Sequence, residues 1–156
     1  MKHIVVTTDF STEAESAFDY TKKLVQLIGK EKCKITLLKV VDEVAPANIT
    51  FGFGLAIADK KSMLERLHKH ASEKIREIAE KHFAGIPVET LVIKPTNTVY
   101  TEITEFAKTN NVDLIVMSTH GRTGVKHFLL GSVAERVVRQ APCPITVVPI
   151  KSSIKN

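Results

Sequence analysis

Short apolar runs, separated by segments with helical spacing, constrain the fold of this chain most strongly. In the run 113–117, Asp-Leu-Ile-Val-Met, the residues after the aspartate show no polar alternation. This pattern is typical of a strand that is covered on both faces of a parallel sheet. Comparable runs recur along the chain. The predicted strands cover residues 4–8, 34–41, 87–93, 113–117 and 144–149.

Amphipathic helices are predicted between these strands. Apolar residues fall at helical spacing, and Gly29 and Gly85 end the first two segments. The sequences Thr12-x-x-Glu15 and Ser132-x-x-Glu135 fit the capping box. The predicted helices cover residues 12–28, 63–83, 98–108 and 132–140. Alternating strands and helices imply right-handed crossovers and a parallel α/β sheet.

Composition bounds the size and the class of the protein. A chain of 156 residues, with 44% hydrophobic and 25% charged residues, is long enough for one well-buried core and short for two domains. The apolar run that starts at Ile4 reaches Asp9 too soon for a signal peptide, and no run approaches membrane-spanning length. We therefore expect one cytoplasmic domain without a membrane segment.

The net charge of +5 raises the question of nucleic-acid binding. The lysines are dispersed among Glu and Asp residues, which favours a solvated basic surface. There is no Trp and there are two Tyr residues, so aromatic platforms for stacked bases are scarce. We do not expect a nucleic-acid partner.

The two cysteines, Cys33 and Cys143, have no metal-ligand or CxxC spacing. In a reducing compartment they are most simply two thiols. No disulfide and no zinc site are predicted.

A glycine-rich loop from Ser118 to Gly131 joins the strand 113–117 to the helix that begins at Ser132. In open parallel sheets, ligands bind where strand ends meet helix starts, and the amides of a helix N-terminus attract anions. The loop therefore predicts a phosphate-binding site. A plain helix start explains Gly131 and Ser132 nearly as well.

This loop resembles the motif Gly-x2-Gly-x9-Gly-(Ser/Thr) of the nucleotide-binding members of the universal stress protein family. Gly121, Gly131 and Ser132 match it, whereas Ser118 stands where the motif has its first glycine. Residues 4–11 and 144–149 also resemble the family's opening and closing segments. The resemblance implies a single domain over residues 1–150, followed by a polar C-terminal tail at 151–156.

The fold implied by the resemblance is an open five-stranded parallel sheet of order 3-2-1-4-5 with helices on both faces. It is Rossmann-like, of the adenine nucleotide alpha hydrolase-like type. In this order the first and fourth strands are neighbours, and the chain leaves them in opposite directions. The loops that follow these two strands therefore face each other across a crevice.

The resemblance implies that ATP, with or without Mg²⁺, binds in this crevice, and that AMP or cyclic AMP are possible alternatives. The base is expected near Asp9 and Val40, and the phosphates near the glycine loop. The expected binding residues are Thr7, Thr8, Asp9, Val40, Met117, Ser118, His120, Gly121, Arg122, Gly131, Ser132 and Val133.

Several of these residues have a plain structural alternative. Asp9 would equally cap the next helix, and Val40 would equally fill the core. His120 has no Ser or Cys with a supporting carboxylate in a hydrolase pattern, so we assign it no catalytic role.

The function expected from these features is an adenine-nucleotide-binding regulatory module in the stress response, with little or no turnover. The chain lacks GxxxxGK[ST] and a matching acidic Mg²⁺ strand, so the usual parts for fast phosphoryl transfer are missing. Two alternatives stay open: a nucleotide-independent dimeric stress protein that acts through protein contacts, and a slow ATPase or phosphotransferase. A homodimer through the apolar edge strand 145–149 is expected, together with unidentified protein clients.

Overall fold

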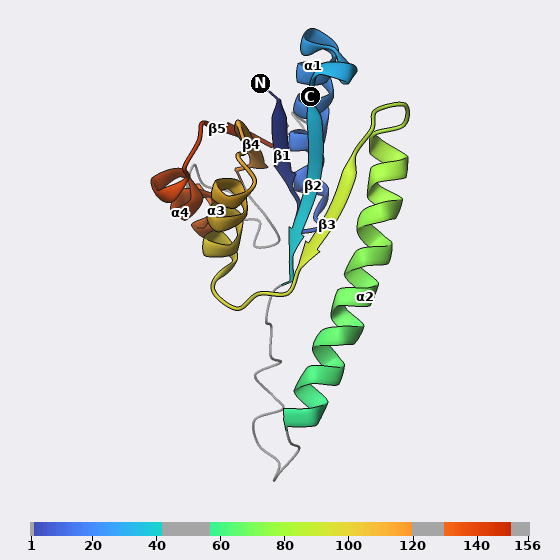
Figure 1. Ribbon diagram of the computed structural model, residues 1–156, viewed down its shortest axis with the longest axis vertical. Helices are drawn as coiled ribbons and strands as arrows, with labels where there is room; N and C mark the ends of the chain where they lie inside the picture. Colours follow the sequence, from blue (N-terminus) through green and yellow to red (C-terminus); the bar gives the residue numbers. More distant parts are fainter. Residues whose placement is uncertain (1, 42–56, 120–129, 151–156) are drawn as a thin grey trace, which may run out of the picture.

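The computed structural model describes residues 2–41, 57–119 and 130–150. Five strands form one sheet in the order β3-β2-β1-β4-β5, and every neighbouring pair is parallel (Figure 1). This order confirms the one implied by the family resemblance. The strands are β1 (His3–Thr7), β2 (Lys34–Val40), β3 (Glu89–Ile93), β4 (Leu114–Ser118) and β5 (Ile145–Val148).

In the part of the chain that the structure describes, four α-helices cover the two faces of the sheet, as predicted. Helices α1 and α2 pack on one face, and α3 and α4 pack on the other (Figure 1). The helices are α1 (Glu15–Ile28), α2 (Ile57–His82), α3 (Val99–Thr109) and α4 (Ser132–Gln140). Two short 3-10 helices, η1 (Thr12–Ala14) and η2 (Lys30–Lys32), flank α1. In the described residues, no helix has both the length and the apolar composition to cross a membrane.

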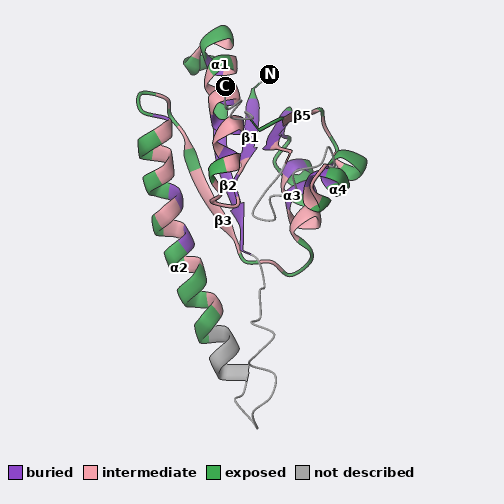
Figure 2. Cartoon of the chain, turned by 180° about the vertical axis from the view of Figure 1, so that it is seen from behind, coloured by how far each residue is buried: buried purple, intermediate pink, exposed green. Residues whose placement is uncertain are grey.

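The core has two halves because alternate side chains of the central strands point to opposite faces of the sheet. Ile4 and Val6 of β1 join the cluster under α1 and α2, whereas Val5 joins the cluster under α3 and α4. All three are 0% exposed. The buried colour runs along β1 and β2 in Figure 2. Burial on both faces explains why these strands show no polar alternation in the sequence.

The predicted ends of the first two helices are confirmed. Gly29 follows α1 with φ of 96°, and Gly85 follows α2 with φ of 77°. Side chains rarely adopt such backbone angles, so glycine is the residue suited to both turns.

The capping box predicted at Thr12 and Glu15 is wrong. The chain passes through η1 before α1 begins, so Glu15 is the first residue of α1. The Thr12 hydroxyl donates to the carboxylate of Glu13 at 3.2 Å and caps no amide.

The capping box predicted at Ser132 and Glu135 is also wrong. Helix α4 begins at Ser132 as predicted, but Gly131 occupies the N-cap position and no side-chain cap is formed. Glu135 pairs with Arg139 one turn further along, at 3.1 Å. In both cases the motif predicted the place of a helix start and missed the contacts made there.

Candidate functional site

The carboxyl ends of β1 and β4 lie together at one edge of the sheet. The two strands are paired in register, with Val6 opposite Val116. From this edge the chain continues from β1 to α1 on one face and from β4 to α4 on the other. Open α/β sheets bind ligands where the chain diverges in this way.

The turn after β1 is held by its own side chains. The buried Thr8 donates its amide to the carbonyl of Leu38 at 2.9 Å, and its hydroxyl oxygen accepts the amide of Phe10 at 3.0 Å. Asp9 accepts the amide of Ser11 at 3.0 Å and also the Ser11 hydroxyl. One role of the Asp9 carboxylate is therefore to fix the turn that leads into η1, whereas no side chain caps the start of η1 or of α1.

Phe10, which sequence analysis did not single out, has an unusual backbone. Its φ is 69°, in the left-handed region that bulky residues rarely occupy. The ring lies near two ammonium groups, with its centroid 5.5 Å from Lys39 Nζ and 5.0 Å from Lys74 Nζ. No local sequence pattern signals these ring contacts, because they come from β2 and α2, far away in the sequence.

The start of α4 is attached to the end of β4 by backbone hydrogen bonds. Thr119 donates its amide to Val148 at 2.9 Å, and Gly131 donates its amide to the carbonyl of Thr119 at 2.8 Å. The first bond inside the helix runs from the Glu135 amide to the Gly131 carbonyl at 2.9 Å. The amides that precede it, including those of Ser132 and Val133, have no acceptor within the helix. A helix end of this kind favours an anion.

Two of the remaining described candidates, Val40 and Met117, form an apolar wall beside this edge. Val40 and Met117 are 3% and 5% exposed and belong to the same core cluster, under α3 and α4. Val40 therefore fills the core, as its structural alternative predicted. Thr7 and Ser118, the last residues of β1 and β4, are half-buried.

The structure thus brings together at one edge of the sheet the candidates from β1, β4 and the start of α4. His120, Gly121 and Arg122 lie outside the described residues, as does the tail at 151–156. Within the part of the chain that the structure describes, no group of three or more His, Cys, Asp and Glu residues gathers to hold a metal ion.

Residues 1–149 match the model of the universal stress protein family. The chain belongs to this family. Universal stress protein MJ0531 of Methanocaldococcus jannaschii is 35% identical to it over 151 residues, covering 94% of this chain and 81% of the relative. Universal stress protein MJ0577 of the same organism is 32% identical over 161 residues, covering 97% of each chain.

Solved structures of relatives share the fold. The structure of MJ0577 superimposes with a TM-score of 0.79 at 29% identity, covering 97% of this chain and 98% of the other. UspA of Lactobacillus plantarum gives a TM-score of 0.74 at 22% identity, covering 94% of this chain and 97% of the other.

Other family structures with this fold contain adenine nucleotides. A family protein of Arabidopsis thaliana has AMP bound. It gives a TM-score of 0.59 at 19% identity, covering 97% of this chain and 94% of the other. The universal stress protein of Archaeoglobus fulgidus has been solved with dAMP. It gives a TM-score of 0.57 at 19% identity, covering 95% of this chain and 98% of the other.

Proposed function

We propose that this universal stress protein binds an adenine nucleotide, with ATP as the preferred ligand, between the carboxyl ends of β1 and β4. The observation that carries the proposal is the start of α4. Its first amides lack acceptors in the helix, and the hydrogen bond from Gly131 to Thr119 holds them at the end of β4, next to β1.

Each end of the nucleotide has a matching part of the site. We assign the adenine to the apolar wall of Val40 and Met117, with Asp9 as the polar group beside it, because flat apolar surfaces suit a purine. We assign the phosphates to the start of α4. The phosphate-binding residues proposed are Gly121, Arg122, Gly131, Ser132 and Val133; Thr7, Thr8, Ser118 and His120 complete the site.

The nucleotides bound to the two distant family structures support adenine as the common element. AMP and dAMP differ at the sugar, and both carry adenine. A site that recognises the base first would accept ATP, AMP or cyclic AMP with affinities set by the phosphate contacts. Mg²⁺ would then accompany the polyphosphate of ATP.

We further propose that binding, with little or no turnover, is the activity, and that the protein acts as a cytoplasmic regulatory module on protein clients. The chain has no GxxxxGK[ST] sequence to position a γ-phosphate for transfer. A slow ATPase is the alternative. Release of inorganic phosphate from ATP over hours would favour the ATPase, and its absence would favour binding without turnover.

Calorimetric titration of nucleotide-stripped protein with ATP, AMP, cyclic AMP and GTP tests the proposal. We expect one site per chain, with binding of adenine nucleotides and much weaker binding of GTP. Equal affinity for ATP and GTP would contradict an adenine pocket. Absence of binding by all four would favour the nucleotide-independent alternative.

A further inference from the structure

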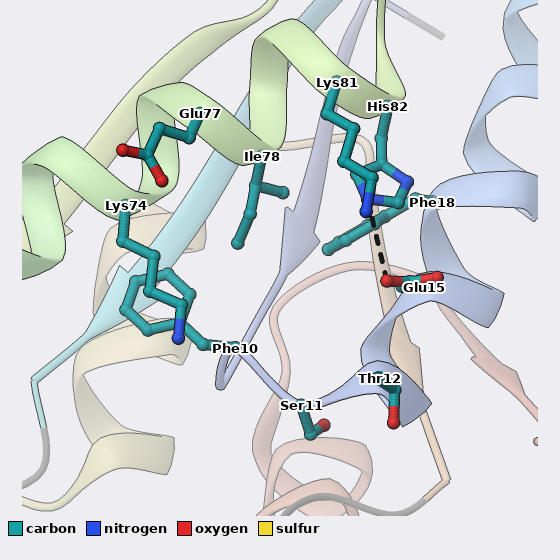
Figure 3. A pocket seen from close by; sticks show the side chains of 10 residues that line it. All are labelled: Phe10, Ser11, Thr12, Glu15, Phe18, Lys74, Glu77, Ile78, Lys81 and His82. Atoms are coloured by element: carbon teal, nitrogen blue, oxygen red, sulfur yellow. Dashed lines mark ion pairs between the residues drawn. The ribbon is translucent and has the colours of Figure 1, made fainter.

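A cavity of about 250 Å³ lies between the beginning of α1 and the C-terminal half of α2 (Figure 3). It is on the α1 and α2 side of the sheet, and its lining includes none of the residues assigned to the nucleotide. The glycine motif at 118–132 does not extend to it.

The apolar part of the cavity lining consists of Phe10, Phe18 and Ile78, and the other seven lining residues are polar or charged. In Figure 3 the Phe10 ring closes one end, the Phe18 ring lies near the other, and Ile78 projects between them. Phe18 is 1% exposed and fixed by ring contacts with His82 and Phe83, at centroid distances of 5.4 and 5.6 Å. A flat apolar group would therefore pack on the half-buried Phe10 ring and Ile78, while the buried Phe18 supports them from below.

Two lysines of α2 give the cavity a positive side. Lys74 is half-buried, and its ammonium lies 5.0 Å from the centroid of the Phe10 ring. Lys81 follows seven residues later, close to two helical turns, so it lies on the same face of α2 and also lines the cavity.

The carboxylates of the lining oppose these cations only in part. Glu15 lies 3.7 Å from His82 Nε2, at the end of the cavity away from Phe10. Glu77 is exposed at the rim. The Lys74 ammonium lies beside the Phe10 ring, and it would attract an anionic group to that end of the cavity.

We propose that this cavity is a second ligand site, for a small aromatic carboxylate whose ring packs on Phe10 and Ile78 and whose carboxylate pairs with Lys74. An apolar cavity of about 150 Å³ holds benzene, so about 250 Å³ suits one ring with its carboxylate. The described lining offers lysines and no arginine, so it lacks the bidentate donors that favour phosphate.

The test is a titration of the ¹⁵N-labelled full chain with sodium benzoate, followed by NMR. Saturable shifts are expected at the amides of Phe10, Ile78 and His82. Lys74→Glu should weaken binding about tenfold or more, since it replaces attraction of the carboxylate by repulsion. Lys69→Glu, an exposed charge reversal on the same helix outside the cavity, is the matched control and should leave the affinity unchanged.

Three companion ligands make the result decisive. Acetate lacks the ring, benzyl alcohol lacks the charge, and inorganic phosphate lacks the ring and carries a different anion. Each should bind much more weakly than benzoate. Equal binding of benzyl alcohol, tighter binding of phosphate, or benzoate shifts confined to Gly131 and Val133 would overturn the proposal, as would the absence of saturable shifts in a folded protein.

Discussion

The amide of Gly131 donates a 2.8 Å hydrogen bond to the carbonyl oxygen of Thr119. Because Thr119 follows β4 directly and Gly131 caps α4, this bond fixes the start of the helix at the end of the strand. The position of the helix amides is thus set by the backbone and does not depend on a side-chain cap. This geometry is the structural basis of the proposed phosphate site.

Ser118→Gly should tighten ATP binding. Ser118 is the half-buried last residue of β4 and replaces the first glycine of the family motif. If its CH₂OH group crowds the ligand, relief of the misfit is worth ~1–3 kcal/mol, or about tenfold to a hundredfold in affinity. Calorimetry on both proteins measures the change, with unfolding curves to verify that the glycine leaves the strand folded. An unchanged or weaker affinity would mean that the serine is neutral or contacts the ligand.

Val147→Lys should convert a homodimer into a monomer. Strand β5 is an edge of the sheet, so its outer amides and carbonyls can pair with the same strand of a second copy. A lysine at this half-buried position, which packs on the core under α3 and α4, would disturb β5 and the pairing along its edge, so unfolding curves must show that the variant is folded. Sedimentation at micromolar concentration reports the change, and Val138→Lys, at an exposed position of α4, is the control. A monomeric wild type, or a dimer indifferent to Val147→Lys, would exclude this interface.

Cys143 should react slowly with a thiol reagent in the native state. Burial raises the pKa of its thiol, so at a given pH below that pKa a smaller fraction is the reactive thiolate than in the unfolded chain. In a Cys33→Ser variant, labelling at pH 8 should therefore be faster in urea than in buffer. Equal rates would show that burial does not protect this thiol.

Both thiols should be free without reductant. Cys33 precedes β2 and Cys143 precedes β5, and the strand order puts β1 and β4 between them. Three strand spacings of ~4.8 Å exceed the separation that a disulfide spans. Labelling of the unfolded wild type should count two thiols, and a count of zero would conflict with the strand order.

Asp113→Asn should lower the melting temperature at neutral pH. The Asp113 carboxylate accepts the amides of Lys2 at 2.6 Å and His3 at 2.9 Å, and these bonds hold its pKa below the ordinary value. A depressed pKa contributes stability above the unfolded-state pKa, and that contribution is lost as the pH falls through the folded-state value. The difference between the two proteins should therefore shrink below about pH 4. The exposed control Glu105→Gln should change little at either pH.

Much of the fold follows from local sequence. Runs such as Ile4-Val5-Val6 predict buried strands because both of their faces must be apolar, and Gly29 and Gly85 predict helix ends because only glycine adopts their backbone angles easily. The strand order did not follow from periodicity, since every strand has the same pattern. It came from the family resemblance, and the structure confirms it.

Contacts within the site were harder to predict. The capping boxes at Thr12 and Ser132 failed because a side chain's partner depends on the turn that precedes the helix, which the motif does not specify. The ring contacts of Phe10 were missed because Lys39 and Lys74 reach its ring from β2 and α2, far away in the sequence. Local patterns thus predict elements better than they predict long-range contacts.

Titration of ATP into the wild type and into Gly131→Leu tests the central proposal most directly. Gly131 has φ of −57° and ψ of 147°, which any residue adopts, so the variant should keep the fold while its side chain occupies the space of the phosphates. Gln140→Leu, an exposed change at the other end of α4, is the control. We expect the wild type and the control to bind ATP. We expect the Gly131→Leu protein not to bind it. Unchanged ATP affinity in a folded Gly131→Leu protein would contradict a phosphate site at the start of α4.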